Sequence, residues 1–208
     1  MADKRASRYP VFVKRTRWED VKNGDFGNHS GNCALSLIIQ ALSHSAWSHS
    51  FNVYRDGYGK LWAFEALNKI ALNPLEDYHK DFDKGQVEIY GLQDPELTQA
   101  MIDDEIRDAV DAYVGEAYDW LGTASLAVVL PVQRLVWAFG GRWTVPSPVR
   151  TTAMKCSELC LRRLVRLIQR HHPTGLSMAV ATFLDRESFI PRDLHELFLK
   201  KPLTAPAK

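Results

Sequence analysis

Residues 49–66 read HSFNVYRDGYGKLWAFEA, a stretch with the pattern of a β-hairpin. Its first and last six residues have strand character, and the Asp-Gly-Tyr-Gly between them is turn chemistry. If the hairpin folds about Gly57, His49 lies opposite Glu65, and directly opposed side chains on one sheet face are about 5 Å apart at Cβ. We therefore expect these two side chains to be neighbours. A shift of one residue in the pairing would instead place them on opposite faces.

Around this hairpin, helical and strand patterns are mixed without strict alternation, which favours an α+β fold over a doubly wound sheet. Asp94, Pro95 and Glu96 have the residue types of a helix start, and Gly115 those of a helix stop. We assign an N-terminal arm to residues 1–19, one domain to 20–200 and a tail to 201–208. Further strands are expected at 11–13, 86–90 and 182–189, and helices from 33 to 42, 94 to 115, 156 to 172 and 194 to 199.

The composition is that of an ordinary globular chain, with 208 residues, 46% hydrophobic and 25% charged. A net charge of +1 gives no electrostatic reason to expect a nucleic-acid partner. The most apolar stretch, 124–139, is interrupted by Pro131, Gln133 and Arg134, so no transmembrane segment is predicted. Three cysteines suit a reducing compartment better than a disulfide framework.

Residues 2–8 are polar and no apolar run follows them, so no signal peptide is predicted. A cytoplasmic location is the default expectation. A phage product or an effector exported by a signal-independent route fits the same observation. Oligomeric state is not predicted.

Cys156 lies at the start of a predicted helix, where unpaired backbone N–H groups stabilise an anion and lower the pKa of a thiol. Such a thiol acts as a nucleophile when a histidine exchanges its proton and a third polar group orients that histidine. His49 and Glu65 supply both parts, and the Cys156 N–H is a candidate oxyanion donor. On spacing alone, the same residues also fit a buried cysteine, a surface histidine and a solvent-facing carboxylate.

A set of short motifs adds to this reading. In order, they are Gly24-Asp25, Ser48-His49, Glu65-Ala66, Tyr118-Asp119, Cys156-Ser157-Glu158-Leu159 and Pro191-Arg192-Asp193-Leu194. This order resembles the permuted papain-like amidases, the circularly permuted branch of the NlpC-like cysteine peptidases, which are related to lecithin–retinol acyltransferase-like enzymes. The resemblance covers roughly residues 20 to 197 and implies a single domain with an antiparallel sheet packed against the helix that bears the nucleophile.

Carried over to this chain, the resemblance makes Cys156 the nucleophile, His49 the general base and acid, and Glu65 the orienting group. It places Tyr118 near the cleft, where it helps to position substrate or to close the site. Trp47 precedes the base closely, so it either lines the same cleft or packs in the core. Members of the family cleave or transfer acyl groups through a thioester, without a metal or other cofactor.

The resemblance predicts amide hydrolysis, with peptides or peptidoglycan stems as the preferred substrates. Acyl transfer or deacylation on lipids is an alternative, for which residues 124–139 would make a peripheral membrane contact. A binding module that has lost turnover is another. The segment between Asp119 and Cys156 and the sequence of residues 28–33 depart from the family pattern, which makes the substrate less predictable.

A zinc site is the main rival interpretation of the same cysteines. His29, Cys33, Cys156 and Cys160 would give Cys₃His ligation if the two helix starts met. A short Cys-x-x-Cys is missing, however, and Cys160 lies naturally on the apolar stripe of its helix. A catalytic pair of Cys33 and His29 is a weaker alternative.

Overall fold

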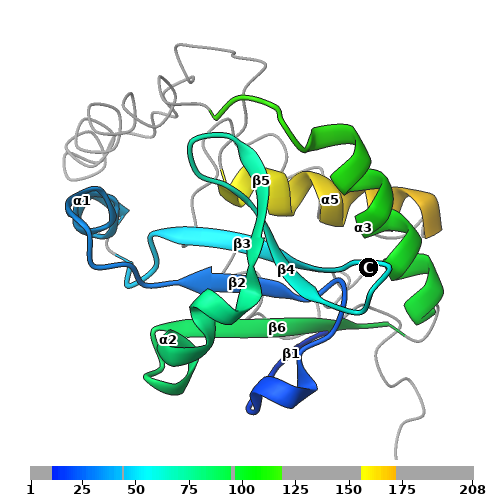
Figure 1. The fold of residues 1–208 in the computed structure, drawn as a ribbon, viewed down its shortest axis with the longest axis horizontal. Coiled ribbons are helices and arrows are strands. Elements are labelled where there is room, and N and C mark those ends of the chain that lie inside the picture. Colours follow the sequence, from blue (N-terminus) through cyan, green and yellow to red (C-terminus); the bar gives the residue numbers. More distant parts are fainter. Residues whose placement is uncertain (1–10, 44, 95–96, 119–155, 172–208) are drawn as a thin grey trace, which may run out of the picture.

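The computed structural model describes residues 11–43, 45–94, 97–118 and 156–171, and these form an α+β fold built on one antiparallel sheet (Figure 1). The α+β class expected from the mixed patterns is therefore correct. Several predicted features lie outside the described residues: the strand at 182–189, the helix at 194–199, the apolar stretch 124–139 and the tail from 201.

The sheet has six strands in the order β1-β6-β2-β3-β4-β5, and every neighbouring pair is antiparallel. Four of these six strands were predicted. β2 was missed because it is polar and contains a glycine, and β5 because it ends in proline. β1 lies within the segment assigned to an N-terminal arm and forms one edge of the sheet. The strands are β1 Val11–Lys14, β2 Phe26–His29, β3 His49–Arg55, β4 Leu61–Ala66, β5 Ile70–Pro74 and β6 Val87–Gln93.

The β3–β4 hairpin has a different register from the one expected. Phe51, not His49, lies opposite Glu65, and the pairing is centred on Tyr58 rather than Gly57. The offset is two residues, which preserves the face on which each side chain lies. His49 and Glu65 are therefore diagonal neighbours on one face, still within reach of long side chains.

The hairpin loop explains this shift. The Asp56 side chain accepts hydrogen bonds from the N–H groups of Tyr58 and Lys60, both at 2.9 Å. It also accepts one from Nε1 of Trp62 at 2.8 Å. Gly59 has φ +84°, a conformation that favours glycine. One carboxylate thus organises a loop wider than the tight turn that the sequence suggested.

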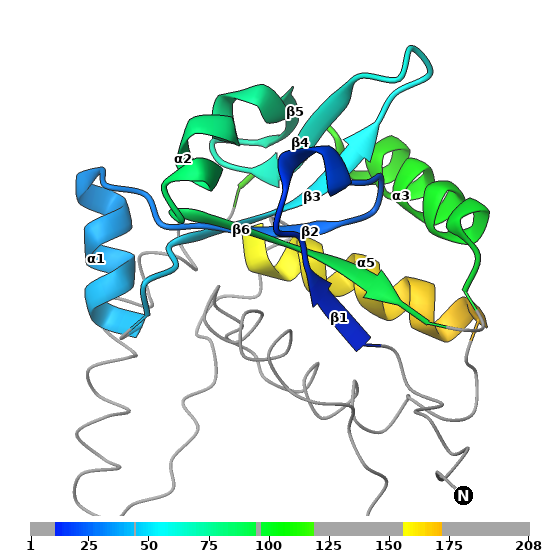
Figure 2. The ribbon, with the colours of Figure 1, turned by 90° about the horizontal axis from the view of Figure 1, so that it is seen from below.

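Two long helices lie side by side over one face of the sheet, α3 (Gln99–Tyr113) and α5 (Cys156–His171) (Figures 1 and 2). α5 starts where predicted, but α3 starts later. Thr98, not Asp94, is its N-cap, and the Thr98 hydroxyl accepts the N–H of Met101 at 3.3 Å. Gly115, with φ +97°, follows the end of α3 as expected.

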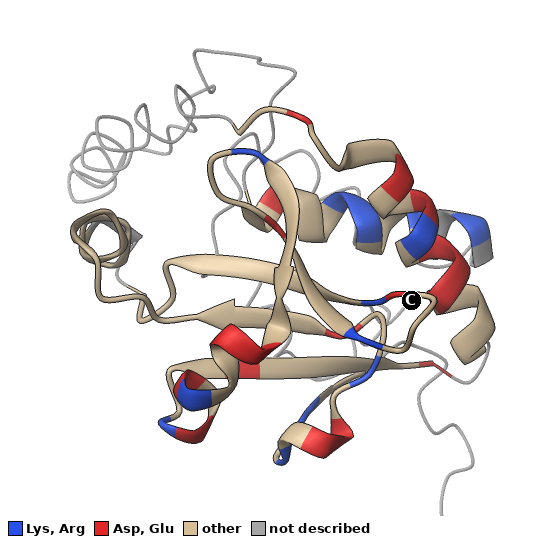
Figure 3. Ribbon diagram, viewed as in Figure 1, with Lys and Arg blue, Asp and Glu red and all other residues tan. Residues whose placement is uncertain are grey.

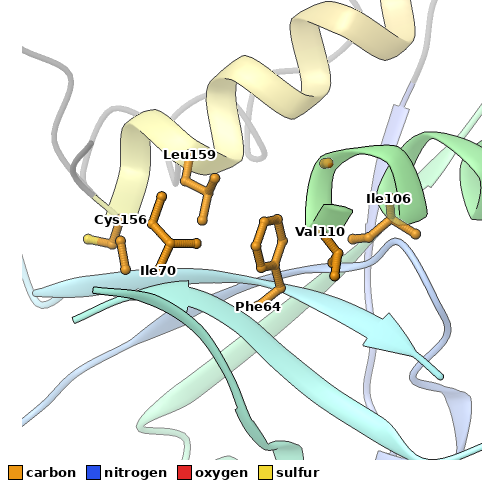
Figure 4. Packing of buried hydrophobic residues seen from close by; sticks show 8 residues of the cluster. Phe64, Ile70, Ile106, Val110, Cys156 and Leu159 are labelled. Atoms are coloured by element: carbon orange, nitrogen blue, oxygen red, sulfur yellow. The ribbon is translucent and has the colours of Figure 1, made fainter. Parts of the chain in front are cut away.

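The core under α5 follows the predicted apolar stripe of that helix, from which every residue is buried. Phe26 and Tyr90 of the sheet pack against α5 from Cys160 onward, and Phe64 and Ile70 pack against its first turn (Figure 4). Burial of this stripe supplies the hydrophobic driving force that fixes α5 on the sheet. The stripe consists of Cys156, Leu159, Cys160, Leu164, Leu167 and Ile168.

Arg163 lies within this core and was not singled out from the sequence. Its side chain is fully buried; Nη1 donates to the carbonyl of Gly24 at 2.8 Å and to Oδ1 of Asn52 at 3.1 Å. Its guanidinium lies 4.7 Å from the centre of the Phe26 ring. Burial lowers its pKa to about 10, which leaves it charged at neutral pH. Arg163 thus ties α5 to β3 and to the turn before β2.

The exposed side of α5 is basic and faces the acidic side of α3 (Figure 3). Glu105 of α3 is fully buried and lies 3.3 Å from Arg166 and 2.9 Å from Arg170. Burial raises the pKa of Glu105, and the nearby guanidinium groups oppose that rise. These ion pairs join the two helices that cover the sheet.

Short helical segments cover the opposite face: η1 (Trp18–Asp20), η2 (Leu75–Tyr78) and α2 (His79–Asp83). Trp18 stacks on His79 with ring centres 4.5 Å apart, and η2 buries Leu75 completely. The core on this side consists of Val21, Phe51, Val53, Ala63, Leu75, Val87 and Ile89.

The helix predicted from residue 33 is α1 (Ala34–Ser43), which stands at the end of the sheet, apart from α3 and α5 (Figures 1 and 2). It carries no charged residue, and Leu35, Leu37 and Ile38 are 40%, 54% and 51% exposed. None of the described helices combines the length and apolarity needed to cross a bilayer.

Candidate active site

Cys156 is the first residue of α5, and its side chain is 5% exposed. Its sulfur points away from Leu159 and Ile70 of the apolar cluster (Figure 4). Burial alone would raise the pKa of this thiol. The charge and hydrogen bond of His49, together with the backbone N–H groups of Ser50 and Ser157, outweigh burial and lower it. These groups therefore favour the thiolate form of the sulfur.

Two different elements supply these backbone donors. Ser157 belongs to the first turn of α5, where N–H groups have no partner within the helix. Ser50 lies in β3 just beyond the last β3–β4 pair, Phe51 with Glu65. The sulfur thus lies where the helix start meets the end of the paired strands. The predicted use of the Cys156 N–H as an oxyanion donor stays a prediction.

His49 opens β3, and its ring lies between the sulfur of Cys156 and the carboxylate of Glu65. Nε2 is 2.5 Å from Oε2 of Glu65, which leaves Nδ1 for the hydrogen bond with Cys156. Burial favours the neutral ring, but the charge and hydrogen bond of Cys156 and the Glu65 carboxylate outweigh burial. They raise the pKa of His49 to about 10. The geometry thus favours a thiolate–imidazolium pair.

Glu65 is 1% exposed and accepts three hydrogen bonds. Besides His49, Oε2 accepts from the hydroxyl of Tyr78 at 2.6 Å, and Oε1 accepts from Nδ2 of Asn73 at 2.8 Å. Burial would raise the pKa of this carboxylate, but the donors and the His49 charge lower it. Because Asn73 and Tyr78 hold this buried carboxylate in place, it fixes the orientation of the His49 imidazole.

The structure therefore brings together the three side chains that the sequence singled out for catalysis. Asn73 and Tyr78 were missed. Asn73 lies on β5 two residues beyond Ala71, the cross-strand partner of Glu65, and so shares its face. Recognising β5 as a strand would have indicated Asn73, whereas nothing in the local pattern indicates Tyr78.

The two residues proposed to contact substrate have different surroundings. Tyr118 is partly buried and packs against the cluster that contains Cys156. Trp47 is 8% exposed and lies two residues before His49, so most of its ring is enclosed. Contact of either residue with a substrate stays a prediction.

The four residues of the zinc interpretation have separate partners. Cys33 is exposed and contacts the Ser36 hydroxyl, Nε2 of His29 lies 3.2 Å from Asp81, and Cys160 accepts from Asn52. Over the described residues, no group of three histidine, cysteine or acidic side chains is arranged to hold a metal ion. The alternative catalytic pair of Cys33 and His29 is not favoured, because Cys33 contacts Ser36 and His29 contacts Asp81.

No family model matches the chain. None of the curated proteins matches it either. Among solved structures, it is similar to the metalloprotein YiiX from Escherichia coli O157:H7, with 18% identity over 82% of this chain and 84% of that one, and a TM-score of 0.48.

Proposed function

We propose that this protein is a cysteine hydrolase of the permuted papain-like type, which cleaves amide bonds through Cys156, His49 and Glu65. The observation that carries the proposal is the continuous hydrogen-bonded series from the Cys156 sulfur through His49 to a fully buried carboxylate. Peptides or peptidoglycan stems are the substrate class that the sequence motifs favour.

In the proposed reaction, His49 first donates a proton and then takes one back, and Cys156 first forms and then releases a bond to the acyl group. The Cys156 thiolate attacks the carbonyl carbon, and the imidazolium of His49 gives its proton to the leaving amine as the C–N bond breaks. The product is a thioester on Cys156 and a neutral imidazole. Water then attacks the thioester and gives a proton to His49, which releases the carboxylic acid and restores the ion pair.

Buried ion pairs of this kind are costly to build, which supports a chemical role over a structural one. Placing a thiolate, an imidazolium and a carboxylate in one buried cluster carries a large desolvation penalty. A buried cysteine that served only packing would have a raised pKa, as Cys160 has four residues later on the same helix face. The lowered pKa of Cys156 is typical of a reactive thiol.

Acyl-enzyme trapping tests the proposal directly. The experiment uses the Cys33→Ala variant, which lacks the one exposed cysteine. This protein is incubated with activated acyl esters and peptide amides and then analysed by intact mass and peptide mapping. We expect one acyl group on Cys156 that turns over with time, and none in the Cys156→Ala variant. Absence of acylation across both substrate classes, with a folded protein, would contradict the proposal.

A second candidate is hydrolysis or transfer of lipid acyl groups, favoured by the exposed apolar α1. This helix connects β2 to the segment that leads into His49, so its side chains Leu35, Leu37 and Ile38 flank the proposed site along the chain. The two candidates differ in substrate: Leu37→Glu should reduce turnover of vesicle-borne esters while leaving a soluble peptide amide unaffected. If Leu37→Glu turned over both substrates at the rates of the parent protein, the lipid candidate would be refuted.

A further inference from the structure

Tyr78 contacts the proposed triad at Oε2 of Glu65, the oxygen that pairs with His49. Its hydroxyl donates to Oε2 of Glu65 at 2.6 Å, and the same oxygen pairs with Nε2 of His49 at 2.5 Å. The other carboxylate oxygen is held separately by Asn73. Tyr78 therefore acts on the half of the carboxylate that faces the base.

The ring of Tyr78 is fixed by contacts that do not involve the carboxylate. It stacks on Phe51, with ring centres 4.6 Å apart and planes 22° apart, and Phe51 is the cross-strand partner of Glu65. It also meets His29 edge-on, with centres 5.2 Å apart. These contacts fix the direction of the hydroxyl, because a ring held on its face and edge leaves the hydroxyl little lateral freedom.

The charged and titratable groups around Glu65 come from several elements. His49 of β3 is in direct contact, and Cys156 of α5 lies beyond it. His29 of β2 lies directly across from His49 in the sheet and is paired with Asp81 of α2. Burial would drive Glu65 toward its neutral form, and the three donors oppose this. Loss of one donor should therefore shift the carboxylate toward protonation.

We propose that Tyr78 is a positioning residue that acts through Glu65, holding Oε2 against Nε2 of His49 so that the imidazole stays aligned on Cys156. This inference rests on the proposed cysteine–histidine chemistry. It adds a fourth side chain, one that acts on the triad through Glu65, and predicts that the Tyr78 hydroxyl extends thiolate reactivity to lower pH.

The test is the pH dependence of Cys156 alkylation by iodoacetamide from pH 4 to 9, measured in the Cys33→Ala protein with and without Tyr78→Phe. Phenylalanine retains the ring contacts with Phe51 and His29 and removes only the hydroxyl. The acidic edge of the profile should move up by about one pH unit, as expected for losing one hydrogen bond to a buried charge.

Tyr90→Phe is a matched control. The Tyr90 hydroxyl also donates to a glutamate, Oε2 of Glu88 at 2.6 Å, but that glutamate pairs with Lys14 at the other side of the sheet. Its profile should superimpose on that of the parent. An equal shift in both variants would show a general effect of removing a buried hydroxyl and would overturn the inference.

The remaining outcomes separate the role of Tyr78 from the proposed function. A parent with low-pH reactivity at Cys156 and an unchanged Tyr78→Phe profile would overturn the role of Tyr78 and leave the proposed function standing. A parent with an ordinary thiol profile would refute the proposed function itself. A second measurement needs no variant: a slowly exchanging tyrosine hydroxyl proton with a nuclear Overhauser effect to the His49 ring should be present, and its absence counts against the inference.

Discussion

Replacing His49 by alanine should slow alkylation of Cys156 most strongly below pH 7. Burial alone raises the pKa of this thiol, and the charge and hydrogen bond of His49 are the main influences that lower it. Without the imidazolium, burial raises the pKa of the thiol and the backbone N–H groups of Ser50 and Ser157 lower it, so we take the ordinary value of 9.0 as the reference for the variant. At pH 6 about one molecule in a thousand would then carry a thiolate.

The expected rate change is smaller than the change in ionisation. A thiolate of low pKa is a weaker nucleophile, with a Brønsted coefficient of about 0.4–0.5, so that roughly half of the gain is lost on a logarithmic scale. We therefore expect His49→Ala to reduce the labelling rate at pH 6 by roughly 10- to 50-fold. The difference should shrink as the pH approaches 9, where an ordinary thiol ionises.

The assay is peptide-mapped labelling with iodoacetamide in the Cys33→Ala background. This background is needed because Cys33 is exposed and its pKa is lowered by hydrogen bonds from Ser36, so it would react in competition. His79→Ala is a matched control, since the His79 side chain stacks on Trp18 and lies 4.0 Å from Asp83 rather than contacting Glu65. Equal labelling rates for the two histidine variants across pH 5–9 would refute the ion pair.

Three further predictions concern stability. The pKa of the Glu65 carboxyl is lowered in the folded protein, so ionised Glu65 stabilises the fold above its unfolded pKa near 4.5, and this stabilisation is lost as pH falls through the lower folded value. Glu65→Gln should therefore flatten the decline in melting temperature below about pH 4.5. Arg163→Ala should cost about 2–4 kcal/mol in urea unfolding, whereas the exposed Arg162→Ala should cost under about 0.5; similar values for both would contradict the tie to Gly24. Gly27→Ala should cost about 1–3 kcal/mol, because a Cβ there would lie 2.1 Å from the Phe51 ring, and Gly57→Ala, with open space around it, should be neutral by the same measurement.

Local patterns were sufficient for the parts of the fold that depend on neighbours in sequence. The β3–β4 hairpin and α5 follow from alternation and from helical spacing, and both were predicted within a residue or two. The register was wrong by two residues because it depends on how Asp56 organises the loop. The pairing of His49 with Glu65 survived this error because an even offset keeps both on one face.

The residues that the sequence did not indicate are those whose role depends on distant partners. Arg163 looks like one more arginine on a basic helix, and only the approach of Gly24 and Asn52 explains its burial. Tyr78 and Asn73 become relevant once β5 joins the sheet beside Glu65. Pairing of Cys156 with His49 was inferred from motif order, since no local pattern relates residues so far apart in the chain.

The large separation of Cys156 from His49 in the chain has a consequence for biogenesis. Every described strand is encoded before α5, since β6 ends at Gln93, so the sheet and the Glu65–His49 contact can form while later residues are still being synthesised. During that interval His49 lacks the thiolate that raises its pKa, and Cys156 lacks its imidazolium. In the proposed mechanism, the thiolate–imidazolium pair therefore forms only when α5 docks on the completed sheet.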